Sequence, residues 1–404
     1  MKIGIVTEWF ERGSAYVSKQ ISESLEAEGW EVHIYARGEH RDLSQPLWGG
    51  KYVWEGAPAK LPLPKPVNKY DFERWLLVNN FDLILFNEQI SLAPVLWAKA
   101  AGIPTVAYID YYTRDTVKDF KVYDALICNT QRHFQVFSWH PAAHFIPWGT
   151  DVDVYTPRHT PSPRPFTFFH SAGWSPERKG TDLVIRAFEE HLKLHPESKL
   201  VLHSQADLSR LFPDLGPTIA RLEKQGSLNI NFETVGAPGL YHLGDVYVYP
   251  SRLDGIGLTI AESLSSGLRL ITTDEDPMSE FAKAPHSLRV SVASAWERDD
   301  GYYWPMVEPD LKSLVSALDL AAGEKSAIST MREDIRQYAT SNLDWRKNSI
   351  RMARMLQQVS ATTPINPTLF DKLRLNATTL QYEIYRLAKS PLEAWSRFRR
   401  SAGL

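Results

Sequence analysis

Short apolar runs alternate with amphipathic segments in the first 150 residues, and this alternation constrains the fold more than any other feature. The expected strands are "KIGIV", "EVHIYA", "DLILFN", "PTVAYID" and "ALICN". Between the first two, "AYVSKQISESLEAEG" places Val17, Ile21 and Leu25 four residues apart, which is the spacing of one helix face. Strand, helix and strand at this spacing predict βαβ units and a parallel sheet.

The same alternation restarts after a proline-rich segment. The segment "TPRHTPSPRPF", residues 156–166, contains four prolines and is typical of a linker between domains. Further strands are then expected at "TFFHSAG", "SKLVLHS", "INFETVG", "DVYVYPS" and "LRLITTD". We therefore predict an α/β protein with two Rossmann-like, doubly wound parallel-sheet domains, residues 1–155 and 167–342. They would face a central cleft, because ligands of open α/β sheets bind at the carboxyl ends of the strands.

Composition excludes several classes of protein. The formal net charge of -3 does not fit a nucleic-acid-binding protein, which carries a basic footprint. The single cysteine, Cys128, excludes an internal disulfide framework and favours a reducing compartment. The sequence has no run of about 20 apolar residues that could span a membrane. The start, "MKIGIVTEWF", fits a first strand better than a signal peptide, so we expect a cytoplasmic protein.

A glycine-bearing turn follows the strand "DVYVYPS". Gly255 and Gly257 let the backbone turn tightly into the helix "LTIAESLSSG", which begins near Leu258. The free N–H groups at the helix start carry about half a positive charge, which suits a diphosphate. Glu262, one turn into the helix, could accept hydrogen bonds from ribose hydroxyls, and Asp254 would point towards a sugar. The alternative is a plain strand–helix turn with Glu262 in solvent.

A second turn carries a cation. The segment "SAGWSPERKGTDL" places Lys179 between a strand that ends at Gly173 and the start of a helix. Lys179 would then neutralise phosphate oxygens at the same edge of the sheet. The alternative is a solvated lysine beside Arg178. A third turn, with the single glycine Gly13, follows the first strand of the chain and is a weak signal by itself.

Three stretches resemble a known family. "IPWGTDVDVYTP" is similar to the "IPNGVDxxxFxP" stretch of the GT-B fold glycosyltransferases, and "SAGWSPERKGTDLVIRAF" is similar to their "GRxxxxKGxxxLxxAF". "LGDVYVYPSRLDGIGLTIAESLSSGLRLITTD" resembles their "ADVFVxPSxxEGFGLxxxEAMAxGxPVIAT". The order and spacing match over most of the chain. The sequence most resembles the large retaining family of the bacterial glycosyltransferase 4 type, within the glycosyl transferases group 1.

The resemblance implies a role for each motif residue. Glu262 takes the place of the ribose-binding glutamate, and Asp254 takes that of the acid that contacts the donor sugar. Lys179 takes the place of the phosphate-binding lysine, and Gly13 belongs to the N-terminal glycine-rich loop. The other residues expected to bind the donor are Gly173, Gly255, Ile256, Gly257 and Leu258.

Several positions depart from the family pattern. Trp174 stands where the family has the arginine partner of Lys179, and Arg178 is the expected substitute. Asp254 is one methylene shorter than the usual glutamate. Trp148 replaces the usual asparagine. These departures leave the identity of the donor open.

The family needs neither a metal nor a covalent nucleophile, so the resemblance implies no cofactor besides the nucleotide-sugar donor. The acidic triplets at residues 151–153 and 274–276 resemble a metal-binding motif of another fold. We assign them no metal, since three-residue matches are common by chance. The residues after the strand "PTVAYID" would face the cleft and contact the acceptor; they are Asp110, Tyr111, Tyr112 and Arg114.

The C-terminal part of the chain carries two further predictions. Residues 343–361 should form a helix that crosses back to the first domain, as the family's terminal helix does. Residues 362–404 carry seven Lys or Arg against three Asp or Glu, mixed with large apolar residues. Such a basic amphipathic extension could lie on an anionic membrane. It could equally pack on its own protein or on a twin subunit.

The sequence thus predicts a retaining, metal-independent glycosyltransferase of the hexosyltransferase type, as used in polysaccharide biosynthesis. It would move a sugar from a nucleotide-diphosphate sugar to a glycan or lipid-linked acceptor, with no nucleic-acid partner. The expected location is the cytoplasm, at the inner face of the membrane if the extension binds lipid. Two alternatives stay open, namely a GT-B nucleotide-sugar epimerase and a non-catalytic nucleotide-sugar-binding or scaffold protein.

Overall fold

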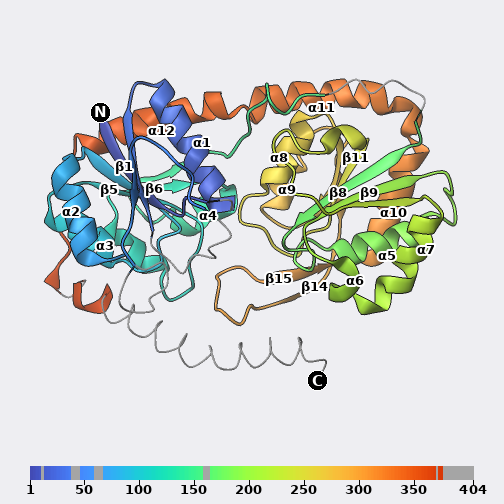
Figure 1. Ribbon diagram of the computed structural model, residues 1–404, viewed down its shortest axis with the longest axis horizontal. Helices are drawn as coiled ribbons and strands as arrows, with labels where there is room; N and C mark the ends of the chain where they lie inside the picture. Colours follow the sequence, from blue (N-terminus) through green and yellow to red (C-terminus); the bar gives the residue numbers. More distant parts are fainter. Residues whose placement is uncertain (11–12, 38–45, 59–66, 158–163, 370–371, 376–404) are drawn as a thin grey trace. The chain divides into compact units, whose positions relative to one another are not determined.

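The computed structural model describes residues 1–10, 13–37, 46–58, 67–157, 164–369 and 372–375. The chain divides into two compact units (Figure 1). The first unit comprises residues 1–128, 133–146 and 349–404, and the second comprises residues 129–132 and 147–348. Most of the predicted linker, residues 158–163, lies outside the described residues.

The first unit is built on a seven-stranded parallel sheet with the order β3-β2-β1-β4-β5-β6-β7. Its strands are β1 (Lys2–Thr7), β2 (Glu31–Ala36), β3 (Val53–Glu55), β4 (Leu83–Asn87), β5 (Thr105–Tyr108), β6 (Ala125–Cys128) and β7 (Ala143–Phe145). Strands β4, β5 and β6 are buried along their whole length. Strands that are covered on both faces are nearly continuous apolar runs, which is why the sequence pattern locates them.

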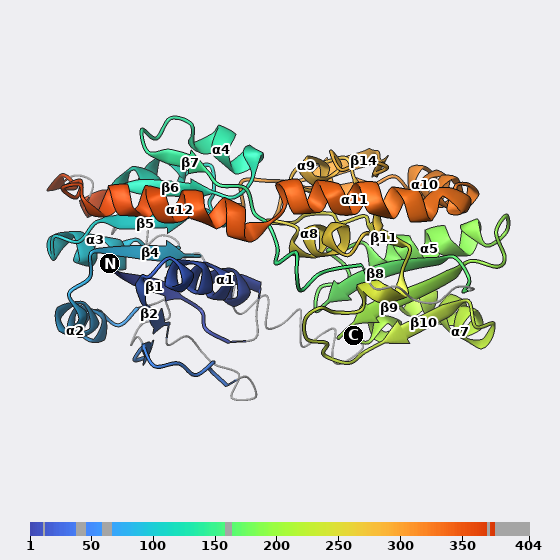
Figure 2. The ribbon, with the colours of Figure 1, turned by 90° about the horizontal axis from the view of Figure 1, so that it is seen from above.

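Helices lie wholly or partly in the first unit. They are α1 (Gly13–Ala27), α2 (Lys69–Asn79), α3 (Ala93–Ala100), η1 (Val117–Val122), α4 (Gln131–Phe137) and α12 (Trp345–Ser360). Of these, α4 and α12 each begin in residues of the second unit. The side chain of Asn68 accepts a hydrogen bond from the backbone N–H of Asp71 at 3.3 Å, and this contact caps the start of α2. Phe72 and Trp75 anchor α2 in the core, where the helix lies beside α3 (Figure 2).

The second unit has a six-stranded parallel sheet with the order β10-β9-β8-β11-β12-β13. Its strands are β8 (Thr167–Gly173), β9 (Lys199–Ser204), β10 (Leu228–Asn231), β11 (Val246–Tyr249), β12 (Arg269–Thr273) and β13 (Leu288–Val290). An antiparallel ribbon follows, formed by β14 (Val292–Trp296) and β15 (Met306–Pro309). The sheet reverses its strand order between β8 and β11, so these two neighbours mark its switch point.

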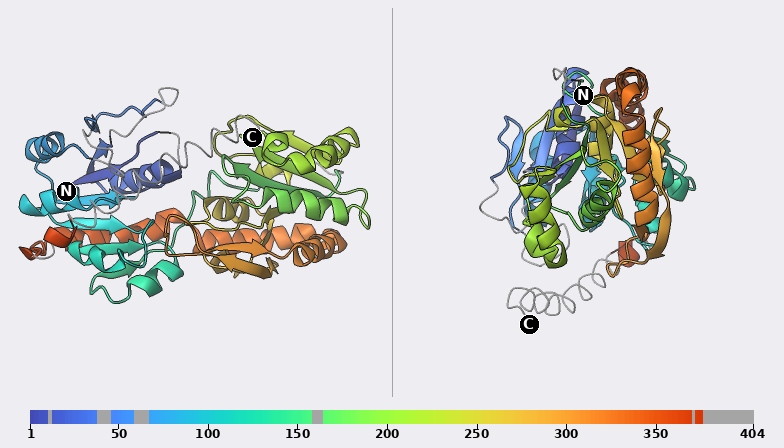
Figure 3. Two further views of the ribbon diagram at one scale, coloured as in Figure 1. Left: turned by 90° about the horizontal axis from the view of Figure 1, so that it is seen from below. Right: turned by 90° about the vertical axis from the view of Figure 1, so that its right-hand side faces the viewer.

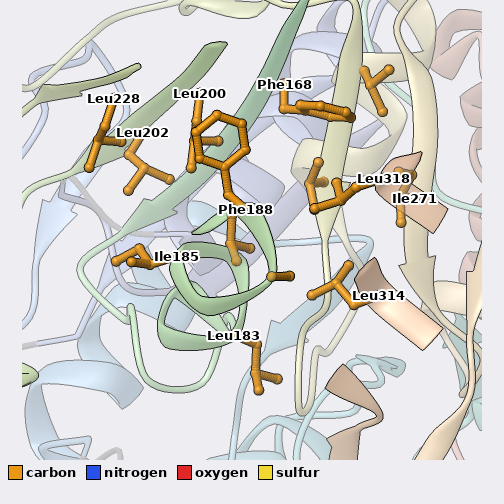
Figure 4. Packing of buried hydrophobic residues seen from close by; sticks show 14 of the residues in the cluster. Phe168, Leu183, Ile185, Phe188, Leu200, Leu202, Leu228, Ile271, Leu314 and Leu318 are labelled. Carbon is orange, nitrogen blue, oxygen red and sulfur yellow. The ribbon is translucent and has the colours of Figure 1, made fainter. Parts of the chain in front are cut away.

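Helices cover both faces of this second sheet. They are α5 (Thr181–His191), α6 (Leu208–Leu211), η2 (Pro213–Leu215), α7 (Gly216–Lys224), η3 (Tyr241–Leu243), α8 (Leu258–Ser265), α9 (Met278–Phe281), α10 (Leu311–Gly323), η4 (Lys325–Ala327) and α11 (Ile328–Asn342). Helices α5, α7 and α10 pack on one face, and α8, α9 and α11 pack on the other (Figure 3). On the first face, Phe168 of β8, Phe188 of α5 and Leu314 of α10 meet in a buried apolar cluster (Figure 4).

The predicted fold class is confirmed, since each unit is a doubly wound α/β domain on a parallel sheet. One predicted strand is misplaced: instead of residues 230–236, the strand β10 spans Leu228–Asn231, because Leu228 supplies its buried apolar contact. The ribbon β14–β15 was not predicted. Within the described residues, no helix combines the length and apolar character needed to cross a membrane.

The described start of the C-terminal extension packs on the first unit. Asp124 accepts a hydrogen bond from the backbone N–H of Ile365 at 2.6 Å, and Arg374 lies 3.1 Å from the carboxylate of Asp119. Leu375 is buried. These contacts favour the packing alternative for residues 365–375 as far as they are described. Residues 370–371 and 376–404 of the predicted extension lie outside the described residues.

Gly180 is a point of close approach between the loops that follow β8 and β11. Its φ is +71°, and a Cβ atom built there would lie 2.2 Å from the carbonyl oxygen of Pro250. We expect Gly180→Ala to lower the free energy of unfolding by roughly 3 kcal/mol or more, because the left-handed backbone and the overlap both oppose it. Urea denaturation would measure the loss.

Gly226→Ala is the matched control. Gly226 also has a positive φ, +65°, but a Cβ atom there would meet nothing within 4 Å. This control should lose only about 1 kcal/mol, the cost of the backbone conformation. Equal losses in the two variants would show that the two loops do not pack as described.

Candidate functional site

Two loops meet at the switch point of the second unit, at the carboxyl ends of β8 and β11. The loop after β8 comprises residues 174–180, and the loop after β11 comprises residues 250–257. The side chain of Arg178 donates a hydrogen bond to the backbone oxygen of Leu253 at 2.6 Å. The backbone N–H of Arg252 donates a hydrogen bond to the backbone oxygen of Arg178 at 2.8 Å. In open α/β sheets, ligands bind outside the carboxyl ends of the strands at such a switch point.

A buried ion pair joins the two loops. The ammonium of Lys179 lies 3.2 Å from Oδ2 of Asp254, and the guanidinium of Arg178 lies 3.7 Å from the same oxygen. The side chains of Lys179 and Asp254 are 14% and 13% exposed. The other carboxylate oxygen of Asp254 accepts a hydrogen bond from the backbone N–H of Gly255 at 2.8 Å. One carboxylate therefore holds two cations at the end of the sheet.

Burial and pairing shift the pKa values of this pair. Burial by itself would raise the pKa of Asp254, but the charges of Lys179 and Arg178 outweigh it and hold that pKa well below its usual range. Burial lowers the pKa of Lys179, and Asp254 opposes this shift. Strongly perturbed groups that gather at a switch point are typical of functional sites.

Helix α8 begins beside this pair. Gly257 ends the loop with a φ of +83°, which favours glycine, and Leu258 is the first helical residue. The first N–H groups of a helix have no partner within the helix and carry a partial positive charge, so this end can bind an anion. The structure therefore places a buried cation, Lys179, and a helix N-terminus on adjacent loops.

Glu262 lies one turn into α8 and is held by tyrosines. The hydroxyl of Tyr241 donates to Oε2 of Glu262 at 2.5 Å, and the side chain of Tyr155 also hydrogen bonds to this carboxylate. Burial raises the pKa of Glu262, and these two hydrogen bonds oppose the shift. The two tyrosines thus fix the orientation of the carboxylate.

Sequence reasoning missed several residues of this site. Tyr249 at the end of β11 receives a hydrogen bond from Lys179 and donates one to Asp254. Tyr247 and Tyr249 are two residues apart on β11, so their side chains lie on the same face of the strand, and this spacing is the signal that could have indicated Tyr249. Nothing in the sequence pattern indicated that Tyr241 would reach Glu262.

Arg252 was also missed. Its guanidinium binds both carboxylate oxygens of Asp182 at 2.8 Å and both of Glu308 at 2.7 and 2.9 Å. Asp182 lies in the first turn of α5, and Glu308 lies in β15. Arg252 therefore ties the loop after β11 to α5 and to the ribbon, which limits how far the loop can move.

His170 of β8 is a structural residue of the site. Its ring nitrogens hydrogen bond to the backbone oxygen of Val248 at 2.7 Å and to the hydroxyl of Thr181 at 2.8 Å. Burial lowers its pKa to about 4, so the ring stays neutral near neutral pH. The histidine joins β8, β11 and α5 and adds no charge.

The remaining predicted donor residues lie in these two loops or at their edge. Gly173 ends β8 with a φ of +55°, and Ile256 is buried in the loop after β11. Trp174, in the position where the family has arginine, is 68% exposed. The structure thus brings together, within one unit, all of the predicted catalytic and donor-binding residues except Gly13.

Gly13 and the predicted acceptor residues belong to the first unit. Gly13 opens α1, and Asp110, Tyr111 and Arg114 follow β5. Tyr112 is buried, and its hydroxyl hydrogen bonds to Nδ1 of His133 at 2.7 Å. The roles assigned to these residues stay predictions.

Comparison with known proteins supports the resemblance that the sequence motifs of the second unit predicted. Residues 165–293 match the family model described as glycosyl transferases group 1. These residues contain both loops, Lys179, Asp254 and Glu262. No curated protein sequence matches the chain.

Solved structures resemble most of the chain. Sucrose-phosphate synthase from Thermosynechococcus elongatus is 16% identical, with a TM-score of 0.64; the match covers 89% of this chain and 99% of that one. HepE from Anabaena, in complex with UDP and glucose, is 15% identical, with a TM-score of 0.65 and coverage of 89% and 100%. A glycosyltransferase from Rickettsia africae is 13% identical, with a TM-score of 0.67 and coverage of 89% and 99%.

These findings confirm the predicted resemblance at the level of the fold and the group. The narrower assignment to the glycosyltransferase 4 type stays a prediction. The chain has the GT-B fold of glycosyltransferases, and residues 165–293, within its second unit, match the glycosyl transferases group 1 family.

Proposed function

We propose that this chain is a retaining, metal-independent glycosyltransferase that moves a sugar from a nucleotide-diphosphate sugar to a glycan or lipid-linked acceptor. The observation that carries the proposal is the convergence of a buried lysine, a helix N-terminus and an oriented carboxylate at one switch point. Lys179 and α8 suit a diphosphate, and Glu262 suits the hydroxyls of a ribose next to it. The family match of residues 165–293 agrees with that use.

The chemistry rests on the charge that develops as the diphosphate leaves. Lys179 and the N–H groups at the start of α8 would stabilise that charge, and preorganised groups of this kind are often the largest single contribution to catalysis. Arg178 would add to the positive field, since it lies 3.7 Å from the carboxylate that also holds Lys179. Asp254 stays ionised because of its cations, so its carboxylate could accept hydrogen bonds from hydroxyls of the donor sugar.

UDP-glucose is the first donor to test, because HepE, which shares the fold, has been solved with UDP and glucose. The acceptor would be contacted by residues of the first unit, namely Asp110, Tyr111, Tyr112 and Arg114. Membrane contact through residues 362–404, and with it a location at the inner face of the membrane, stays a prediction. Ile365 and Arg374 contact the first unit, so we would expect membrane contact to involve other residues of the extension.

Glu262 and Lys179 should differ in what they contribute. Glu262→Ala should weaken UDP binding by about 1.5–3 kcal/mol, or roughly 10- to 150-fold, because ribose hydroxyls lose a charged acceptor. Lys179→Ala should lower kcat by about 10²- to 10³-fold and affect UDP affinity less, because charge grows on the leaving group. Calorimetric titration with UDP and steady-state kinetics with the donor would measure both effects.

Lys193→Ala is the control for the lysine variant. Lys193 is an exposed lysine of the same unit, and it pairs with Glu190 at 2.6 Å. Because this pair lies outside the two loops of the site, Lys193→Ala should leave UDP affinity and kcat unchanged. Glu262→Gln, which keeps the shape and loses the charge, should bind UDP with intermediate strength. Wild-type affinity in Glu262→Ala together with wild-type kcat in Lys179→Ala would refute the site assignment.

Activity should survive an excess of EDTA, because Lys179, Arg178 and α8 already supply the positive charge that a divalent ion would bring. Among the described residues, one group has ligand atoms close enough to share an ion: His191, His195 and Asp319. His191 lies at the opposite end of α5 from Lys179. Activity that is lost with EDTA and restored by magnesium or manganese would show that the diphosphate needs a metal after all.

A further inference from the structure

Three buried tyrosines form a row behind the two carboxylates of the donor site. The ring of Tyr247 lies 5.8 Å from that of Tyr241 and 5.5 Å from that of Tyr249, measured between ring centroids. All three side chains are buried in the apolar cluster beneath α8. Two of the three hydroxyls reach a carboxylate: Tyr241 donates to Glu262, and Tyr249 donates to Asp254.

Tyr249 occupies the central position of the Lys179–Asp254 pair. Its hydroxyl donates to Oδ2 of Asp254, the same oxygen that faces Lys179, and accepts a hydrogen bond from Nζ of Lys179. A phenol has one proton to give and lone pairs to receive, so one hydroxyl can make both contacts at once. Nζ of Lys179 also lies 4.6 Å from the centroid of the Tyr249 ring. The three groups form a closed triangle of hydrogen bonds.

We propose that the hydroxyl of Tyr249 is a positioning group of the donor site, which holds Asp254 and Lys179 in the relative arrangement that catalysis requires. The inference rests on the proposed function, because it assigns Lys179 to the departing diphosphate. Tyr249 itself would touch neither the donor nor the reacting atoms. It acts by removing the freedom of the carboxylate to rotate away from the lysine.

The surroundings of Tyr249 make its hydroxyl a permanent donor. Burial raises the phenol pKa well above its usual value, and the negative charge of Asp254 raises it further, so the proton stays on the oxygen across the physiological range. Hydrogen bonds to a charged group are stronger than those between neutral groups. Without the hydroxyl, Oδ2 of Asp254 keeps Lys179 and Arg178 but loses a donor that belongs to strand β11 of the sheet.

Tyr247 provides a matched control. It lies two residues earlier on β11, is equally buried, and stacks on the ring of Tyr249. Among the described contacts, its hydroxyl bonds to neither Asp254 nor Glu262. Tyr247→Phe therefore removes a buried phenolic oxygen from the same row and leaves the proposed positioning intact.

The kinetic test compares Tyr249→Phe with Tyr247→Phe. Tyr249→Phe should lower kcat about tenfold, the loss expected for one hydrogen bond to a charged group, with the donor KM changed less than about twofold. Tyr247→Phe should keep wild-type kcat and KM. Equal effects in the two variants, or a Tyr249→Phe variant that changes KM and not kcat, would overturn the proposal.

A double-mutant cycle tests whether Tyr249 acts through Asp254. In the Asp254→Asn background, Tyr249→Phe should cause little further loss of kcat, because the two groups work as a unit. Losses that multiply would show that Tyr249 acts independently of Asp254, which contradicts a positioning role.

A second readout does not depend on activity. Reductive methylation with ¹³C-formaldehyde labels lysines for NMR, and the signal missing from Lys179→Arg identifies Lys179. That signal should shift in Tyr249→Phe and stay in place in Tyr247→Phe; a Lys179 signal unchanged in Tyr249→Phe overturns the inference. If no nucleotide sugar is turned over by the wild type, the proposed function fails, and this signal still decides whether Tyr249 positions Lys179.

Discussion

The contact between the loops after β8 and β11 is the constraint on which the rest of the second unit's site depends. Gly180 has no side chain, so the loop that carries Lys179 can pack against Pro250 in the loop after β11. Because β8 and β11 are adjacent at the switch point, residues about 75 positions apart in sequence meet in space. This contact, together with the hydrogen bonds between the same two loops, brings Lys179, Asp254 and the start of α8 together.

A buried ion pair at this place has a cost as well as a use. Taking two charges out of water costs more than a simple contact returns, unless further hydrogen bonds complete the site. Here Asp254 accepts further hydrogen bonds from the hydroxyl of Tyr249 and the backbone N–H of Gly255. Arg252 holds the loop in place through its contact with Asp182. The arrangement holds a cation in place before any anion arrives, so little reorganisation is left for the moment of reaction.

The sequence predicted the central strands of both sheets, because these strands are buried apolar runs, and it predicted α1 because that helix is amphipathic. The edge strands β3, β7 and β13 were not predicted, since they are only three residues long and partly exposed. The sequence also predicted the loops that carry Lys179 and Asp254, because each loop has glycines between an apolar run and an amphipathic segment, and this pattern can be recognised in the sequence alone. It could not predict Tyr241 on Glu262 or the two carboxylates on Arg252, which are contacts between segments 21 to 70 residues apart. The ribbon β14–β15 was missed because its residues are largely exposed and show little apolar alternation.

The most direct test of the central claim is binding of nucleotide sugars to the wild type and to Glu262→Ala. A ligand that binds the native state raises its apparent stability, so UDP-, GDP-, ADP- and dTDP-sugars can be screened by thermal shift. We predict that at least one of these donors raises the melting temperature of the wild type and has little effect on Glu262→Ala. Equal stabilisation of both proteins, or no stabilisation of the wild type by any donor at millimolar concentration, would contradict a nucleotide-sugar site at the start of α8.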